Sequence, residues 1–242
     1  MKSIINCVKY QYRQYLLSTK FIVPTILYAG LMGFMYSIAP VYAVSIFSLM
    51  SLFLFIFMAW MSAMCQDLEP EVSEQIIILR MQSARKYYYS QVLFYAGLCG
   101  LITTLSLAYP LLSHYLHGQK LFSRSLVGMD IVGGFLLMFL CSFAGCMVGT
   151  VFSPRIVRNP KARIILIVLV VALSVTRIGI VSEHPMTRFF LWIVPPISDL
   201  ISWFTKEEYF QPGRLCEACL ILLLYGIVLA VVQVELSRSR KF

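Results

Sequence analysis

Long apolar runs alternate with short polar links along the chain, and six of the runs reach membrane-spanning length. A helix of about 20 apolar residues crosses the hydrocarbon core of a bilayer. The runs lie near Phe21–Ile38, Ala43–Met64, Gln91–Leu112, Val127–Phe152, Ile164–Val181 and Leu215–Val234. The pattern predicts an all-α polytopic membrane protein with six transmembrane helices, organised as a single transmembrane domain over residues 1–242.

Residues 1–20 carry a different pattern, with apolar positions at helical spacing and polar positions between them. The apolar positions are Ile5, Val8, Tyr12 and Leu16, and the polar ones include Lys9, Arg13 and Gln14. A helix of this kind lies in the plane of the membrane interface. A cytosolic extension of the first span is the alternative, and the interleaved Tyr, Gln and Lys residues argue against it.

The link between the fifth and sixth runs, residues 182–213, is largely apolar but contains the pair Pro195 and Pro196. A proline pair breaks a helix, and each half is too short to cross a bilayer. Trp192 and Trp203 are of a residue type that favours interfacial depth. We therefore expect a broken re-entrant segment on the outer side, with an ordinary amphipathic loop as the alternative.

Composition and charge add an orientation to this picture. Hydrophobic residues make up 60% of the chain and charged residues 13%, so there is no room for a soluble catalytic domain. With both termini cytoplasmic, 14 Lys and Arg residues fall inside and 5 outside, as the positive-inside rule requires. The inside set is Lys2, Lys9, Arg13, Lys20, Arg80, Arg85, Lys86, Arg155, Arg158, Lys161, Arg163, Arg238, Arg240 and Lys241; the outside set is Lys120, Arg124, Arg188, Lys206 and Arg214.

The same count accounts for the net charge of +9, so no nucleic-acid partner is implied. The basic residues of the link 153–163 can also touch anionic membrane lipids or a partner. We expect a multi-pass protein of a plasma membrane, of bacterial type.

One link is densely charged, and it forms an expected coupling segment over residues 67–90. Glu69, Glu71 and Glu74 come first, an isoleucine-rich stretch follows, and Arg80, Arg85 and Lys86 come last. Acids early and bases late complement a helix dipole. An apolar stretch beside these charges suits a helix that docks in the groove of a partner protein, with a solvated loop as the alternative.

Three ionisable residues lie within or at the edge of the expected spans: Asp130, Arg177 and Glu217. Such residues cost roughly 2.5–3.5 kcal/mol on insertion scales, so they usually face a partner or water. All three fall in the outer half, where Arg177 could pair with either carboxylate. The expected network has a structural role in helix packing, with a role in a substrate route as the alternative.

The fourth run is rich in small residues, namely Gly133, Gly134, Ala144, Gly145 and Gly149. Small residues allow helices to approach closely. They support packing within the subunit or against a second copy.

The sequence contains no motif of an enzyme that works within a membrane. It lacks a GxxxxGK[ST] phosphate-binding loop and an HExxH zinc motif. No catalytic residue, metal site or cofactor is therefore expected in this chain.

With these features the chain resembles the permease subunits of ABC-2 type (type V) ABC transporters over its whole length. The residues that fit the family's coupling helix are Glu74, Ile78, Leu79, Arg80, Ser83, Arg85 and Lys86, whereas Met81 stands where proline is frequent and Gln91 where lysine is frequent. The resemblance implies a separate ATPase subunit that binds ATP and Mg, and a second permease chain in a homo- or heterodimer. It also implies outward transport of a peptide, drug or lipid-like substrate, including antimicrobial-peptide export or immunity.

Two other classes remain as alternatives. An ATP-independent secondary transporter or channel would place polar residues near the bilayer midplane. A membrane scaffold or sensor subunit would transport nothing.

Overall fold

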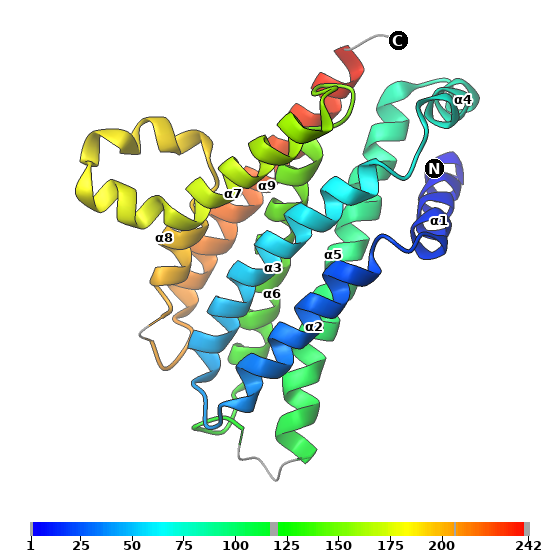
Figure 1. Ribbon diagram of the computed structural model, residues 1–242. Coiled ribbons are helices and arrows are strands. Elements are labelled where there is room, and N and C mark those ends of the chain that lie inside the picture. The colour runs from blue at the N-terminus through cyan, green and yellow to red at the C-terminus, as the bar shows by residue number, and fades with distance from the viewer. Residues whose placement is uncertain (1, 117–120, 206, 240–242) are drawn as a thin grey trace.

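The computed structural model describes residues 2–116, 121–205 and 207–239, and these residues form helices joined by short links (Figure 1). No β-strand occurs among them, which confirms the all-α prediction. The helices are α1 (Lys2–Leu17), α2 (Ile22–Ser37), α3 (Ala43–Gln66), α4 (Glu71–Met81), α5 (Ala84–Leu116), α6 (Gly128–Val151), α7 (Pro160–Glu183), α8 (Ile197–Ser202) and α9 (Pro212–Ser239), with 3₁₀ turns η1 (Pro185–Arg188) and η2 (Phe190–Ile193) between α7 and α8. Of the residues in the expected segments and charge sets, 1, 120, 206, 240 and 241 lie outside the described residues.

Five of the helices are long and apolar enough to cross a membrane, namely α3, α5, α6, α7 and α9. The first expected span corresponds to α2, which has 16 residues and a length of about 24 Å. Taken together with α1, it forms a pair bent by 77° that meets the same test. The chain therefore has five helices of spanning length, or six when the bent pair is counted as one.

The centre of the bundle is the pair α3 and α6, which are the most buried of the five helices. Small residues on α6 bring the two backbones together. A Cβ atom at Gly145 would lie 2.2 Å from the carbonyl oxygen of Phe55, and one at Gly149 would lie 2.3 Å from that of Ala59. At these two positions, the small residues serve packing within the subunit.

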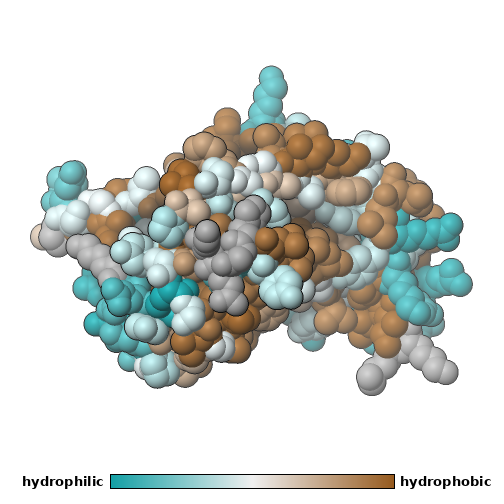
Figure 2. Space-filling model, turned by 90° about the horizontal axis from the view of Figure 1, so that it is seen from below, coloured by the Kyte–Doolittle hydropathy of each residue, from teal (hydrophilic) through white to brown (hydrophobic). Residues whose placement is uncertain are grey.

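The outer helices present apolar side chains to their surroundings. Only 17% of the apolar window of α7 and 22% of that of α9 is buried inside the structure. Ile165 and Val168 on α7, and Leu224 and Val228 on α9, are more than half exposed. Seen from below, the surface carries broad hydrophobic areas, with hydrophilic residues gathered toward its edges (Figure 2). Lipid tails accept such a surface, whereas water does not.

The two ends of the bundle differ in what they carry. At one end, here called the α4 end, lie α1, α4 and the last turns of α9 (Figure 1). At the opposite end, the α2–α3 link pairs with the segment before α6: Val41 donates its N–H to Leu121 O at 3.0 Å and Ser123 donates to Val41 O at 3.0 Å. The charged link between the second and third expected spans thus lies at the end that also holds α1.

Candidate functional site

The charged link forms two helices where the sequence predicted one. Pro70 precedes α4 in an extended conformation, and α4 ends at Gln82, whose left-handed backbone has φ 55°. Ser83 then caps α5, which begins at Ala84, and the Ser83 Oγ accepts the Lys86 N–H at 3.4 Å. Arg85 and Lys86 therefore lie on α5, which corrects the expectation that they extend the helix of Glu74.

The inner face of α4 is held by a charged cluster. Arg155, in the link between α6 and α7, pairs with Glu74 at 3.1 Å through both Nε and Nη2. Tyr88 on α5 donates its hydroxyl to Glu74 Oε1 at 3.2 Å and accepts a hydrogen bond from Arg155. Both charged side chains are mostly buried, at 14% exposure for Glu74 and 13% for Arg155, so removing either one would leave a buried charge unpaired, at a cost of about 3–5 kcal/mol. Glu74 thus binds its own chain.

The apolar side chains of that face complete a small second core. Ile77, Ile78 and Met81 pack with Cys7 of α1, Tyr87 and Tyr88 of α5 and Val234 of α9. Ile78, which the sequence assigned to a docking surface, therefore faces the bundle. This core fixes α4 against three helices.

The opposite face of α4 is also apolar, and it is exposed. Val72, Ile76 and Leu79 are 66%, 60% and 77% exposed. Their spacing of four and then three residues puts them on one side of the helix. Arg80 lies exposed beside them. We call Val72, Ile76 and Leu79 the α4 stripe.

A groove runs between α1 and α4 next to this stripe. Its volume is about 560 Å³, and its lining includes Asn6 and Tyr10 of α1 with Ser73, Ile76 and Arg80 of α4. Ile76 belongs both to the stripe and to the groove. The exposed apolar surface of α4 thus continues into a concave region.

A second ion pair joins the link before α4 to α7. Arg163 donates to both carboxylate oxygens of Asp67, at 2.8 and 2.6 Å, and its side chain is only 6% exposed. Lys20 donates to the Asp67 carbonyl at 3.1 Å. From the sequence, Arg155 and Arg163 were expected to mark orientation and to touch lipid or a partner, and no pairing with Glu74 or Asp67 was expected. The link before α4 is acidic and the link before α7 is basic, and this opposite charge could have predicted that the two links pair.

The other predicted coupling residues make weaker contacts. Arg85 on α5 pairs with Glu235 on α9 at 3.1 Å, with both side chains about half exposed. An exposed pair of this kind contributes about 0–1 kcal/mol. Lys86 is exposed one residue further along α5.

The expected network of Asp130, Arg177 and Glu217 is not formed. Asp130, only 1% exposed, accepts two hydrogen bonds from Arg124 at 2.8 and 2.9 Å, and it caps α6 by accepting the Val127 N–H at 3.0 Å. The hydrogen bonds from Arg124 to Asp130 raise the pKa of the guanidinium, which also stacks 3.8 Å above the Tyr209 ring. Asp130 therefore has its partner in the preceding link.

Arg177 has a different partner, and Glu217 lies exposed on α9. Arg177 Nε lies 3.3 Å from Asp199 Oδ2 on α8, and its Nη1 donates to the Val194 carbonyl at 3.4 Å. Arg177 is itself buried. In place of the expected network there are two separate ion pairs, Arg124 with Asp130 and Arg177 with Asp199. The Arg177 pair ties α7 to the broken segment.

The broken segment lies against the middle of α9. Tyr225, near the midpoint of α9, donates its hydroxyl to the Trp192 carbonyl in η2 at 2.5 Å. At the other end of the segment, Ser45 at the start of α3 donates to the Thr205 carbonyl at 2.6 Å. The short helices therefore run from the middle of the bundle to the end opposite α4.

Comparison with known proteins finds no match for this chain among family models, curated proteins or solved structures. A proposal for its function therefore rests on the geometry of its own residues and on the resemblance seen in its sequence.

Proposed function

We propose that this chain is the membrane subunit of an ATP-driven exporter of the ABC-2 type, and that α4 docks on a separate ATPase subunit. The proposal places the α4 end in the cytosol, since the basic residues gather in the links at that end. Both chain termini are then cytoplasmic. The α1–α2 pair, bent by 77°, supplies an interfacial helix followed by a first span.

The observation that carries the proposal is the α4 stripe. The inner face of α4 is covered by its own chain, yet Val72, Ile76 and Leu79 remain exposed on a helix outside the five spanning helices. A helix that is apolar on both faces gains by burying the second face in a protein partner. Three anchors on one helical face suit insertion into a groove.

Two ion pairs, one on α4 and one in the link before it, supply a route from that partner to the spanning helices. A push on α4 reaches the α6–α7 link through Glu74 and Arg155, and Asp67 and Arg163 join the preceding link to α7 itself. At its other end, α7 holds α8 through Arg177 and Asp199. Motion driven by ATP in the partner would thus travel along α7 to the broken segment, which the proposal places in the outer leaflet.

The remaining parts of the proposal come from the family resemblance. ATP and Mg would bind to the ATPase, and a second permease chain, identical or related, would complete the transporter. The cargo would be a peptide, drug or lipid-like molecule that moves outward, as in antimicrobial-peptide export or immunity.

The test is co-purification of the chain with a P-loop ATPase encoded beside it. Ile76→Glu combined with Leu79→Glu should abolish association, because two carboxylates would enter an apolar interface. Glu235→Gln, an exposed change at the same end, is the matched control and should retain it. Glu74→Gln should keep association but alter the ATPase rate of the complex, because Glu74 acts within the chain.

Full association of the Ile76 and Leu79 double variant would contradict docking through the α4 stripe. An ATP-independent transporter, a channel or a scaffold predicts no ATPase partner in any variant.

A further inference from the structure

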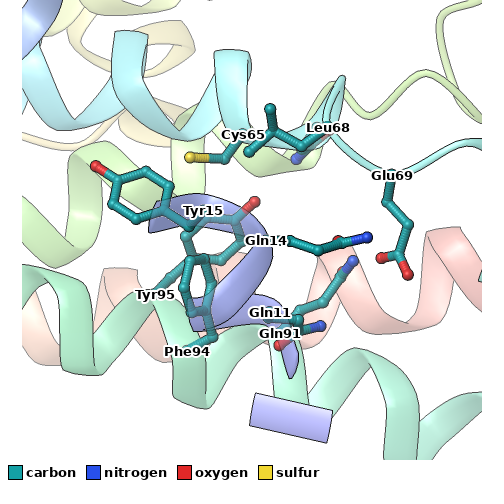
Figure 3. A pocket seen from close by; sticks show the side chains of 10 residues that line it. Gln11, Gln14, Tyr15, Cys65, Leu68, Glu69, Gln91, Phe94 and Tyr95 are labelled. Carbon is teal, nitrogen blue, oxygen red and sulfur yellow. The ribbon is translucent and has the colours of Figure 1, made fainter. Parts of the chain in front are cut away.

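A small polar cavity lies between α1, the end of α3 and the start of α5, beside the link that leads into α4 (Figure 3). Its volume is about 40 Å³. Four glutamines and one glutamate line it, namely Gln11, Gln14, Gln66, Gln91 and Glu69. Figure 3 shows the amide groups of Gln11, Gln14 and Gln91 gathered beside the Glu69 carboxylate. Such a concentration of polar groups inside a bundle calls for partners.

Several of these polar atoms have no hydrogen-bond partner among the described residues. Gln11 is 93% buried, since its exposure is 7%, and neither its amide oxygen nor its amide nitrogen is bonded. Gln66 donates its nitrogen to the Thr150 carbonyl at 2.9 Å, which leaves its Oε1 unbonded. Unsatisfied buried groups each cost about 1–3 kcal/mol, so a ligand that satisfies them is favoured.

Glu69 adds a negative charge to these oxygens. Its Oε2 accepts a hydrogen bond from the Tyr87 hydroxyl at 2.5 Å, whereas its Oε1 is buried and unbonded within the described residues. The nearby cationic groups are engaged elsewhere: Lys20 and Arg163 with Asp67, and Arg155 with Glu74. Burial raises the pKa of Glu69, and the negative charge of Glu74 raises it further, against the Tyr87 hydrogen bond.

We propose that this cavity binds a small monovalent metal cation, Na⁺ or K⁺, through the unbonded oxygens of Gln11, Gln66 and Glu69. A single carboxylate balances a single positive charge. Calcium sites, by contrast, gather six to eight oxygens that include several carboxylates. The volume accommodates an ion together with one or two waters.

The three ligands come from three segments, so the ion would join them. Gln11 lies on α1, Gln66 on the last turn of α3, and Glu69 in the link next to Pro70, where α4 begins. The cation would hold this link against α1 whether or not α4 binds an ATPase, so the site stands apart from the proposed function.

The experiment measures thermal unfolding of the purified full-length chain by tryptophan fluorescence. Solutions of NaCl, KCl and N-methyl-D-glucamine chloride are compared at equal ionic strength, at pH 8 and at pH 5. At a cation concentration ten times Kd, Tm should rise by about 3–6 °C at pH 8 relative to the organic cation. The rise should be smaller at pH 5, where a proton on Glu69 competes with the ion.

Other titratable groups near the cavity or close to Glu69 could also respond to pH. They are Cys7, Tyr10 and Tyr15 on α1, Cys65 on α3, Glu74 on α4, and Tyr87 and Tyr95 on α5.

The variant Glu69→Gln separates the role of the Glu69 carboxylate from these groups and should remove the difference in Tm between the salts. Glu235→Gln, at the same end of the bundle, should preserve it.

Equal Tm values in the three salts at both pH values would overturn the proposal and leave a cavity that holds water only. A pH dependence that is the same in all three salts would also overturn it, in favour of a protonated Glu69. Both outcomes are read from the wild-type chain, so neither depends on whether a variant folds.

Discussion

The close approach of α3 and α6 makes a quantitative prediction for Gly145→Ala. The new methyl group would lie 2.2 Å from the carbonyl oxygen and 2.9 Å from the carbonyl carbon of Phe55, which are backbone atoms that cannot rotate away. Overpacking of this kind costs about 1–3 kcal/mol. Alanine in place of glycine within a helix contributes about 1 kcal/mol in the opposite direction.

The matched variant is Gly179→Ala on α7, where an added Cβ atom meets nothing within 4 Å. It keeps the helix-propensity gain without the collision. The two variants should therefore differ by the packing term alone, about 1–3 kcal/mol in the free energy of unfolding. This difference corresponds to roughly 2–12 °C in Tm for a chain of this size.

The assay is thermal unfolding of the purified chain in detergent, followed by tryptophan fluorescence. Gly145→Ala should melt below Gly179→Ala, with wild type between them or level with Gly145→Ala. Equal melting temperatures for the two variants would refute the packing of α6 directly on the α3 backbone.

Three further predictions concern single residues. Gln82→Gly should raise stability by about 0.5–1 kcal/mol and Gln82→Val should lower it, because only glycine adopts φ 55° without strain; thermal melts followed by circular dichroism would show the order. Arg124→Lys should lower the free energy of unfolding by about 1–3 kcal/mol, and Tm with it, because lysine cannot make both hydrogen bonds to Asp130; an unchanged Tm would contradict the buried pair. The raised pKa of Glu69 means that the folded chain holds this proton more tightly than the unfolded chain, whose value is about 4.5. Without Na⁺ or K⁺, the stability that protonation of Glu69 contributes is therefore present below pH 4.5 and lost as the pH rises through the pKa of Glu69 in the folded chain. Glu69→Gln should flatten the dependence of Tm on pH over that range.

The spanning helices were predictable because their ends coincide with the ends of apolar runs. The expected span Ala43–Met64 became α3 with two more residues, and Val127–Phe152 became α6 with one fewer at each end. The third span was predicted too short. Its helix α5 continues past the apolar run into Ala84–Ser90, since Ser83 caps it and its tyrosines pack in the second core.

The ion pairs were harder to predict, because the sequence does not say which helices are neighbours. Glu74 and Arg155 are 81 residues apart, and Asp67 and Arg163 are 96 apart. The expectation that Arg177 would pair with Asp130 or Glu217 rested only on the similar depth of the three residues in the expected spans. Asp130 instead bonds Arg124, six residues upstream, which had entered only the count of outer basic residues.

The position of α7 at the edge of the bundle has a mechanical consequence. Lipid tails are about as apolar as leucine, so a helix in a membrane gains little free energy by exchanging lipid neighbours for protein ones. Only 17% of the apolar window of α7 is buried inside the structure. Its resistance to sliding therefore comes mainly from two polar points of attachment, Arg163 with Asp67 and Arg177 with Asp199. We expect a helix held in this way to shift more readily than α3 and α6, whose backbones approach each other closely.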